Sequence, residues 1–350
     1  MSWPAAIRDV GGIMANVTGT SVGDFIHRAG DGRTGGGNPV TGVTTGADTI
    51  SGAEGNDLIY GDDGNDTISG GSGDDILYGG QGADALIGGV GYDIFRFEAA
   101  SEVTGLAESF DGGADHDRLD FGSAFGVIDL SLATIVNIEE LNVSGAGNNT
   151  ITLTAAQLGA FSTISAGFGQ DILILSAAGT ADLTGASISG IDEIRGSAGN
   201  DVIALAGVSN GQTVNGAAGN DTITGGTGAD VLDGGAGKDL LTGGGGADRF
   251  VLSVIGDSPA SANRDVITGF SQVEGDRIDL SRIDASTAVV GDQAFSFIGT
   301  GLYTGVAGQL RYSQTGSATV VAGDVNGDGV SDFHVEISGT FVLGAIDFVL

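Results

Sequence analysis

The residues best suited to chemistry in this sequence are aspartates that recur at a fixed spacing. In two stretches of the chain, each aspartate follows the previous one after nine residues. Asp201 precedes the second stretch and is displaced from its spacing by an insertion around 207–214. Carboxylates repeated so regularly can supply the hard oxygen ligands that calcium prefers. The aspartates of the two stretches are Asp48, Asp57, Asp66, Asp75, Asp84 and Asp93, then Asp221, Asp230, Asp239 and Asp248.

Each aspartate is the sixth residue of a nine-residue unit such as GAEGNDLIY at 52–60. Glycine permits positive φ and close backbone approach, so we expect the first six residues to form a tight turn. The aspartates, the residues before them and the fourth-position glycines are therefore the predicted calcium ligands and their support. Besides the aspartates, these residues are Gly55, Gly64, Gly73, Gly82, Gly219, Gly228 and Gly237, with Asn56, Asn65 and Asn220.

The last three residues of each unit predict the strand that positions the turn. Their middle residue is always apolar, and alternation along a strand places it on the inner face. Two units then make one coil of a parallel roll, so that successive aspartates lie on opposite edges. Asp48, Asp66 and Asp84 are expected on one edge and Asp57, Asp75 and Asp93 on the other. Aspartates stacked in this way repel one another unless a cation lies between them.

The excess of acidic residues also indicates that a bound cation is needed for folding. The 350 residues include 45 acidic and 12 basic side chains, which gives a formal net charge of −33. Crowded carboxylates disfavour a compact state. This charge argues against nucleic acid as a partner, because phosphate binding needs lysine and arginine. There is no cysteine for a disulfide or thiolate site, and no apolar run predicts a transmembrane segment.

The nonapeptide closely resembles the G-G-x-G-x-D-x-U-x repeat of the repeats-in-toxin (RTX, hemolysin-type) family. The resemblance implies an all-β fold of parallel β-roll or β-solenoid type, with about six to eight calcium ions in the two blocks. Hard oxygen sites would also accept a trivalent lanthanide. A disordered glycine-rich linker is the alternative, but a linker has no reason to place an apolar residue two positions after every aspartate.

The C-terminal region resembles that of serralysin-type metalloproteases. In that family the region is an uncleaved signal for type I secretion, which implies the type I secretion apparatus as a partner and an extracellular or cell-surface location. The resemblance does not extend to the protease, because H-E-x-x-H is missing and His27, His116 and His334 are isolated. The matching motifs are Asp265-Val-Ile-Thr-Gly-Phe, Gly275-Asp-Arg-Ile-Asp-Leu-Ser, Gly308-Gln-Leu-Arg-Tyr and the closing Asp347-Phe-Val-Leu.

One more metal motif lies in this region. Asp324, Asn326 and Asp328 alternate before a glycine, as at the start of an EF-hand loop. Val335 occupies the twelfth position, so the bidentate glutamate is missing. Asp332 could close a calcium site instead. The alternative is a polar Asx turn.

These patterns predict five parts. An N-terminal cap and loop (1–45) precedes a first β-roll (46–97), a β-rich solenoid middle segment (98–195), a second β-roll (196–252) and the β-rich C-terminal domain (253–350). In the first part, Phe25 to Arg28 are expected to cap the open end of the solenoid, and Ala29 to Thr45 to form a loop. In the middle segment, Thr150–Leu153 and Ile172–Leu175 are predicted strands and Thr154–Phe161 a short helix.

The sequence therefore indicates an exported protein that folds when calcium fills its loops. Two G-x-S-x-G matches and the adjacent Glu139 and Glu140 lack the context of a catalytic site, so we do not expect an enzyme. We expect a structural or adhesive surface or matrix component, with cell-surface or matrix polysaccharide as a possible partner. The alternatives are a membrane-active or host-directed exported protein, similar to small calcium-binding nodulation proteins of rhizobia, or a non-catalytic part of an exported hydrolase system.

Overall fold

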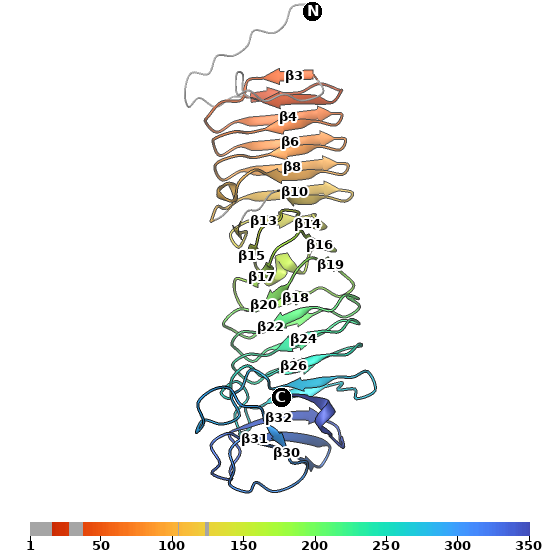
Figure 1. Cartoon of the computed structure of the whole chain (residues 1–350). Helices are drawn as coiled ribbons and strands as arrows, with labels where there is room; N and C mark the ends of the chain where they lie inside the picture. Colours follow the sequence, from red (N-terminus) through yellow and green to blue (C-terminus); the bar gives the residue numbers. More distant parts are fainter. Residues whose placement is uncertain (1–15, 28–37, 104, 123–125) are drawn as a thin grey trace, which may run out of the picture. The chain divides into compact units, whose positions relative to one another are not determined.

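A computed structural model describes residues 16–27, 38–103, 105–122 and 126–350 of the chain. The chain divides into two compact units, each with its own contacts. The first unit contains residues 1–153, 160–172 and 188–191, and the second contains 154–159, 173–187 and 192–350. Both units are built almost wholly from short β-strands (Figure 1).

The first unit is a solenoid whose rungs alternate between two parallel sheets. Residues such as Ile50, Ile68 and Leu86 are directly opposite one another in neighbouring rungs. One sheet, in spatial order, consists of β1 (Asn16–Thr18), β4 (Thr49–Glu54), β6 (Thr67–Ser72), β8 (Ala85–Val90), β10 (Ser109–Ala114) and β13 (Thr134–Val136).

The second sheet of this unit runs in parallel through eight strands. In spatial order they are β3 (Asn38–Thr41), β2 (Asp24–His27), β5 (Leu58–Tyr60), β7 (Ile76–Tyr78), β9 (Ile94–Phe97), β11 (Arg118–Phe121), β14 (Glu140–Val143) and β16 (Thr163–Ala166). A third parallel pairing joins β12 (Val127–Asp129) to β15 (Asn149–Leu153). Two strands contain residues of both units: β17 (Asp171–Leu175) and β19 (Ser187–Ser189).

The second unit begins as the same kind of solenoid. One parallel sheet consists of β20 (Glu193–Arg195), β22 (Thr213–Asn215), β24 (Val231–Asp233), β26 (Arg249–Val251), β28 (Arg277–Asp279) and β33 (Phe348–Val349). The other begins with the parallel strands β18 (Thr180–Asp182), β21 (Val202–Ala204), β23 (Thr222–Thr224), β25 (Leu240–Thr242) and β27 (Asp265–Thr268).

Beyond β27 the pairing in the same sheet changes from parallel to antiparallel. The sheet continues with β32 (Phe333–Ser338), which is parallel to β27, and then with β31 (Ala318–Asp324) and β30 (Gln309–Thr315), which pair as antiparallel hairpins. The short strand β29 (Ser296–Phe297) lies beside β30. β30 and β31 have seven residues each, compared with three in β22, β24 and β26 of the same unit, and they lie at the C-terminal end of this sheet (Figure 1).

The apolar residue in the middle of each strand triad forms the core, as predicted. In the two repeat blocks these side chains are at most 3% exposed, as for Leu241. Their burial stabilises each rung only against its neighbours, because one rung cannot enclose an apolar face alone. The ten residues are Ile50, Ile59, Ile68, Leu77, Leu86, Phe95, Ile223, Leu232, Leu241 and Phe250.

Three local predictions need correction. The strands on one side of the first unit have six residues instead of three, because pairing continues through the glycines, as between Gly71 and Gly89. β3 lies inside the predicted loop from Ala29 to Thr45. Because β2 pairs with both β3 and β5, Phe25 to His27 form an internal rung and not the end cap. Arg28 and residues 29–37 lie outside the described residues.

Helical structure is confined to very short segments in the described parts of the chain. The predicted helix is present as α1 (Ala155–Leu158), which begins with a capping box between Thr154 and Gln157. Two 3-10 turns complete the set, η1 (Ala100–Glu102) and η2 (Ala345–Asp347). None of the helices in these ranges has the length and apolar character needed to cross a membrane.

Candidate calcium sites

The predicted aspartates form hydrogen-bonded ladders along the edges of the first unit. On one edge, the backbone N–H of Asp57 donates to Oδ1 of Asp75 at 2.7 Å, and that of Asp75 donates to Oδ1 of Asp93 at 2.9 Å. On the other edge, the N–H of Asp48 donates to Asp66, and that of Asp66 donates to Asp84, at 2.7 and 2.8 Å. The predicted alternation between two edges is therefore observed.

The second unit repeats this arrangement. The N–H of Asp201 donates to Oδ1 of Asp221, and the N–H of Asp221 donates to Oδ1 of Asp239, each at 2.7 Å. On the opposite edge, Asp230 donates in the same way to Asp248 at 2.9 Å. One oxygen of each accepting carboxylate therefore holds the preceding rung in register.

The second oxygen of most ladder carboxylates has no partner. Asp57, Asp66, Asp75, Asp221 and Asp239 are all at most 2% exposed, and yet their Oδ2 atoms accept no hydrogen bond from any described residue. A buried polar atom without a partner costs about 1–3 kcal/mol, so each of these atoms requires an explanation such as an ion. The same is true of Oδ2 in Asp93, Asp117 and Asp248 and of Oε1 in Glu108.

A smaller group of ladder carboxylates has both oxygens engaged. Oδ2 accepts a hydrogen bond from the N–H of a residue in its own turn: Thr44 for Asp48 at 2.6 Å, Ser197 for Asp201 at 2.7 Å, and Gly226 for Asp230 at 2.6 Å. Asp24 and Asp276 are held similarly by Thr20 and Ser271.

Backbone conformation separates these two groups. In the turns that end at an aspartate with an open oxygen, the residue four positions before that aspartate has a positive φ, for example 118° at Gly71 before Asp75 and 73° at Ala217 before Asp221. Thr44, Ser197 and Gly226 occupy the same position without a positive φ. Their N–H groups reach the carboxylate and occupy the oxygen that the left-handed turns leave open.

Carbonyl oxygens gather around the same open oxygen. A Cβ atom added to Gly70 would lie 2.2 Å from Oδ2 of Asp75 and 2.8 Å from the carbonyl oxygen of Gly88, one rung away. Only glycine fits at this position, because two oxygens fill the space that a side chain needs. The turn therefore brings a carboxylate and a backbone carbonyl together, and these are the ligand types that calcium takes.

Burial perturbs the protonation of these groups. Burial, opposed in part by the hydrogen bond from Asp48 and reinforced by the charge of Asp84, raises the pKa of Asp66 to about 8. Burial likewise raises the pKa of Asp75 and that of Asp239 to about 7. Burial disfavours the charged form of a carboxylate that has no cation beside it. The stacked carboxylates are thus poorly accommodated as free anions.

Sequence reasoning missed the residues that extend these ladders beyond the nonapeptides. Asp84 donates its N–H to Glu108 and Asp93 to Asp117, both at 2.8 Å. In the second unit, Asp265 accepts from Asp239 at 3.0 Å, and Asp276 accepts from Asp248 at 2.9 Å. Each of these acids precedes an apolar residue by two positions, as in Glu108-Ser-Phe110. This pattern of an acid two positions before an apolar residue is the sequence signal for these ligands. A search at nine-residue spacing does not find it, because the rungs that contain these acids are longer.

The predicted asparagines occupy a different place from the aspartates. The Oδ1 atoms of Asn56, Asn65 and Asn220 accept the backbone N–H of Asp74, Ala83 and Lys238 in the next rung, at 2.9 to 3.1 Å. They form an outer, exposed ladder beside the buried one. Their side chains tie neighbouring turns together, and their side-chain oxygens are already engaged.

The residues of the 324–332 loop do converge. Asp324 is fully buried and accepts the N–H groups of Gly327 and Gly329 at 2.7 and 2.9 Å. Asp332 accepts the Asn326 amide at 2.9 Å, and Asn326 accepts the N–H of Asp328 at 2.8 Å. The turn satisfies its own polar groups, as an Asx turn does. An ion here would need the Asn326 amide to turn its oxygen inward.

A calcium ion at a ladder site would need both carboxylate oxygens and backbone carbonyl oxygens as ligands. Among the described residues, no group of three or more His, Cys, Asp or Glu side chains is placed to hold a metal by itself. Calcium takes six to eight oxygen ligands and readily accepts carbonyls. Two stacked carboxylates with the carbonyls of two turns fit that requirement, and the open buried oxygens agree with it.

Two family models match the chain. Residues 43–77 and 60–95 match the RTX calcium-binding nonapeptide repeat, and residues 189–350 match the C-terminal domain of the peptidase M10 serralysin family. The RTX repeat binds calcium, and neither of the two matched parts is catalytic. No curated protein matches the chain.

Several solved structures are similar to parts of the chain. The AlgE6R2 subunit of the Azotobacter vinelandii mannuronan C5-epimerase is 32% identical over 45% of this chain and 92% of its own, with a TM-score of 0.34. The AlgE6R3 subunit of the same enzyme is 27% identical over 45% of this chain and 77% of its own, with a TM-score of 0.23.

The extracellular lipase LipA of Serratia marcescens is 17% identical over 93% of this chain and 42% of its own, with a TM-score of 0.29. The family matches carry the assignment, together with the nonapeptides and the β-roll that they form. The chain contains RTX calcium-binding repeats and a serralysin-type C-terminal domain, which together indicate an exported calcium-binding protein.

Proposed function

We propose that the buried ladder carboxylates with an open oxygen are the calcium ligands of this protein. The observation that carries the proposal is the row of Oδ2 atoms that accept no hydrogen bond within the described chain. The proposed ligands of the first unit are Asp57, Asp66, Asp75, Asp93, Glu108 and Asp117, and those of the second unit are Asp221, Asp239 and Asp248. Asp48, Asp201 and Asp230 belong to the same ladders but are held by N–H groups of their own turns.

The loop from Asp324 to Asp332 is a separate candidate in this proposal. Its backbone N–H groups converge on the buried carboxylate of Asp324, and the side chains of Asn326 and Asp332 meet beside it. Rotation of the Asn326 amide would release Oδ1 of Asp332, while Oδ2 still accepts the N–H of Val325, and would present three carboxylates and one amide oxygen from a single turn. Calcium accepts such short oxygen-rich loops.

We further propose that folding of the rungs requires calcium. Bound calcium supplies positive charge between stacked carboxylates. In its absence, each rung would bury anions that lack a counterion, in a chain with a net charge of −33. Since the binding site exists only in the folded turn, the free energy of metal binding adds to the free energy of folding. Extracellular calcium modules bind at about 10⁻⁴ to 10⁻³ M, which suits a chain exported unfolded and folded outside.

The role after folding is proposed to be structural or adhesive, in a surface layer or matrix. Rungs and the C-terminal sheet account for most of the described residues, and both family matches describe parts without catalytic function. A repeat of rungs offers long, regular faces, which suits contact with extended partners.

Circular dichroism during a calcium titration tests the folding proposal, with magnesium as the control. We expect a cooperative transition from coil to β-structure with calcium alone, because magnesium demands tighter octahedral geometry than these turns offer. A β-rich spectrum that is already complete in chelator would overturn the coupling between calcium and folding.

A further inference from the structure

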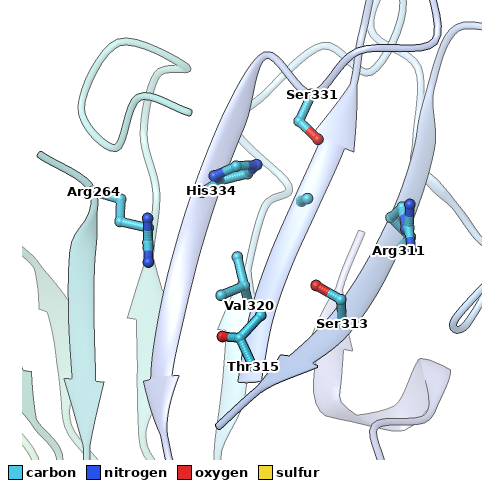
Figure 2. Close-up of a pocket in the computed structure, with 8 residues that line it drawn as sticks. Arg264, Arg311, Ser313, Thr315, Val320, Ser331 and His334 are labelled. Atoms are coloured by element: carbon cyan, nitrogen blue, oxygen red, sulfur yellow. The ribbon is translucent and has the colours of Figure 1, made fainter. Parts of the chain in front are cut away.

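One cavity of the second unit is lined by basic and hydroxyl side chains, in a chain that is otherwise strongly acidic. It has a volume of about 360 Å³ and lies on the antiparallel sheet formed by β30, β31 and β32 (Figure 2). This volume is within the range of small-molecule sites. The polar residues that line it are Arg264, Arg311, Ser313, Thr315, Ser331 and His334.

The strand register brings these side chains to one face. Arg311 on β30 lies opposite Ala322 on β31, which lies opposite His334 on β32. Paired residues of neighbouring strands share a face of the sheet. The small Ala322 and the neighbouring Val320 therefore form the floor between a wall from β30 and a wall from β32. Figure 2 shows Arg311 and His334 on the two sides of this floor.

Arg311 supplies the unpaired positive charge of the cavity. Its guanidinium lies 5.6 Å from the centre of the Tyr303 ring, and it forms no ion pair with any described carboxylate. Arg264, in contrast, is neutralised by Glu336, whose Oε2 lies 2.9 Å from its Nε. The cavity therefore presents a net charge of one cation, although the chain has 45 acidic residues.

The other polar groups are available for hydrogen bonds. Within the described chain, the hydroxyls of Ser313 and Thr315 and the imidazole of His334 form no hydrogen bond. Ser331 shares one contact with Tyr303, at 3.1 Å between their hydroxyl oxygens. Burial, and secondarily the charge of Arg264, lowers the pKa of His334. The imidazole is therefore neutral near pH 7 and can both donate and accept a hydrogen bond.

We propose that this cavity binds a monocarboxylated sugar, an acidic saccharide of the uronate class. The guanidinium fork of Arg311 matches the geometry of a carboxylate, and the hydroxyls and the neutral imidazole match sugar hydroxyls. A single unpaired cation balances a single negative charge. A phosphate dianion would leave one charge uncompensated beside the acidic surroundings. The inference deepens the proposed matrix role by naming a ligand, and it does not depend on the calcium ladders.

Titration of the full-length, calcium-loaded protein with glucuronate tests the inference, with amide chemical shifts as the readout. Glucose, acetate and inorganic phosphate are the comparison ligands, and free calcium is held constant because uronates bind calcium themselves. We expect saturable shifts at residues 309–315 and 331–336 with glucuronate. Glucose lacks the carboxylate and acetate lacks the hydroxyls, so both should bind at least about tenfold more weakly.

Two variants and one control locate the binding. Arg311→Gln should weaken glucuronate binding at least about tenfold, whereas Arg282→Gln removes the same charge outside the cavity and should leave binding unchanged. Ala322→Leu fills the floor without changing charge and should also abolish binding, which covers the case in which Arg311→Gln fails to fold.

Three outcomes would overturn the inference: no saturable shift at the cavity, undiminished binding by a folded Arg311→Gln protein, or tighter binding of phosphate than of glucuronate. The calcium-induced change in circular dichroism is measured separately and does not depend on saccharide binding. A failure of the saccharide proposal can therefore be distinguished from a failure of the proposed calcium-dependent folding.

Discussion

The backbone N–H of Asp75 donates to Oδ1 of Asp93 at 2.9 Å, while Oδ2 of Asp93 is buried and accepts no hydrogen bond from any described residue. One oxygen of the carboxylate thus belongs to the fold, and the other is left for a ligand. The same division recurs along both units. Because register and ligand binding use the same side chains, a change in one of them should affect both stability and calcium affinity.

Replacement of a single ladder carboxylate is the most direct test of the proposed ligands. Asp66→Asn preserves an oxygen that can accept the N–H of Asp48, but it removes the charge and places an amide at the open position. Loss of supporting groups around a metal typically costs about 10–100-fold in affinity, so loss of a ligand should raise the calcium midpoint of the β transition at least about tenfold.

Asp63→Asn is the matched control for this variant. Asp63 lies in the same turn but is exposed, and it pairs with Gln81 in a β-bridge outside the buried ladder. Its replacement should leave the midpoint within about twofold, because surface substitutions change stability by only about 0.5 kcal/mol. Equal midpoints for the Asp66 and Asp63 variants would show that Asp66 is not a ligand.

The regular part of the fold could be predicted from the sequence because each nonapeptide contains its own turn and strand signals. The apolar residue two positions after Asp57, Ile59, fixes the inner face, and the nine-residue period fixes the edge on which each aspartate lies. The strands β15 and β17 and the helix α1 also lie at the predicted positions, since alternation and the Thr154 cap are local signals.

The features that the sequence did not predict are contacts between residues that are far apart along the chain. Glu108 follows Asp84 in the ladder at a separation of 24 residues, because a longer excursion with a 3-10 turn intervenes. Sequence spacing cannot reveal that such an excursion returns to the same edge. The cavity at Arg311 was missed for a related reason, since its walls meet only through the register of two antiparallel hairpins.

Glu108 should hold an ion even though it lies outside the nonapeptides. It is 2% exposed, and its Oε2 accepts the N–H of Asp84 at 2.8 Å, while Oε1 has no described partner. Glu108→Gln should therefore release one calcium ion, counted by native mass spectrometry at saturating calcium. Glu54→Gln, at an exposed position, should retain the full number. Loss of no ion in the Glu108 variant would exclude this site.

Acid should strengthen the calcium-free fold and weaken calcium binding. Burial raises the pKa of Asp66 and that of Glu108 to about 8, compared with about 4 in an unfolded chain. A raised pKa in the folded state contributes stability that is fully present below the unfolded value and is lost as the pH rises through the folded value. In chelator, β-structure should therefore increase as the pH falls from about 8 to about 5.

Calcium binding should follow the opposite trend, because ligands must be deprotonated. The calcium midpoint should rise as the pH falls from about 8 to about 6, and each binding event should release protons, measurable in weakly buffered solution. Titrations at high salt control for the general repulsion of a chain with net charge −33. A midpoint that does not change over this range would contradict the burial of free carboxylates in the ladder.

Gly71, the left-handed residue of the turn that ends at Asp75, should tolerate no side chain, because neighbouring rungs approach closely there. Gly71 has φ 118°, and a Cβ atom there would lie 2.0 Å from the carbonyl oxygen of Ala53 in the neighbouring rung. Gly71→Ala must therefore either strain the backbone or separate the rungs. Such strain costs about 1–3 kcal/mol per residue, so the calcium-saturated protein should unfold at lower urea concentration. Gly256→Ala is the control, since its Cβ would meet no atom within 4 Å.

Urea unfolding at saturating calcium, repeated at several calcium concentrations, separates the two possible effects of Gly71→Ala. If the variant loses only backbone stability, its deficit relative to the native chain stays constant as calcium increases. If the displaced rung also moves the open oxygen of Asp75, calcium stabilises the variant less than the native chain, and the deficit grows with calcium concentration. We expect the second result, because the turn that holds Gly71 also carries Asp75. A constant deficit would show that the turn geometry and the ion site are independent.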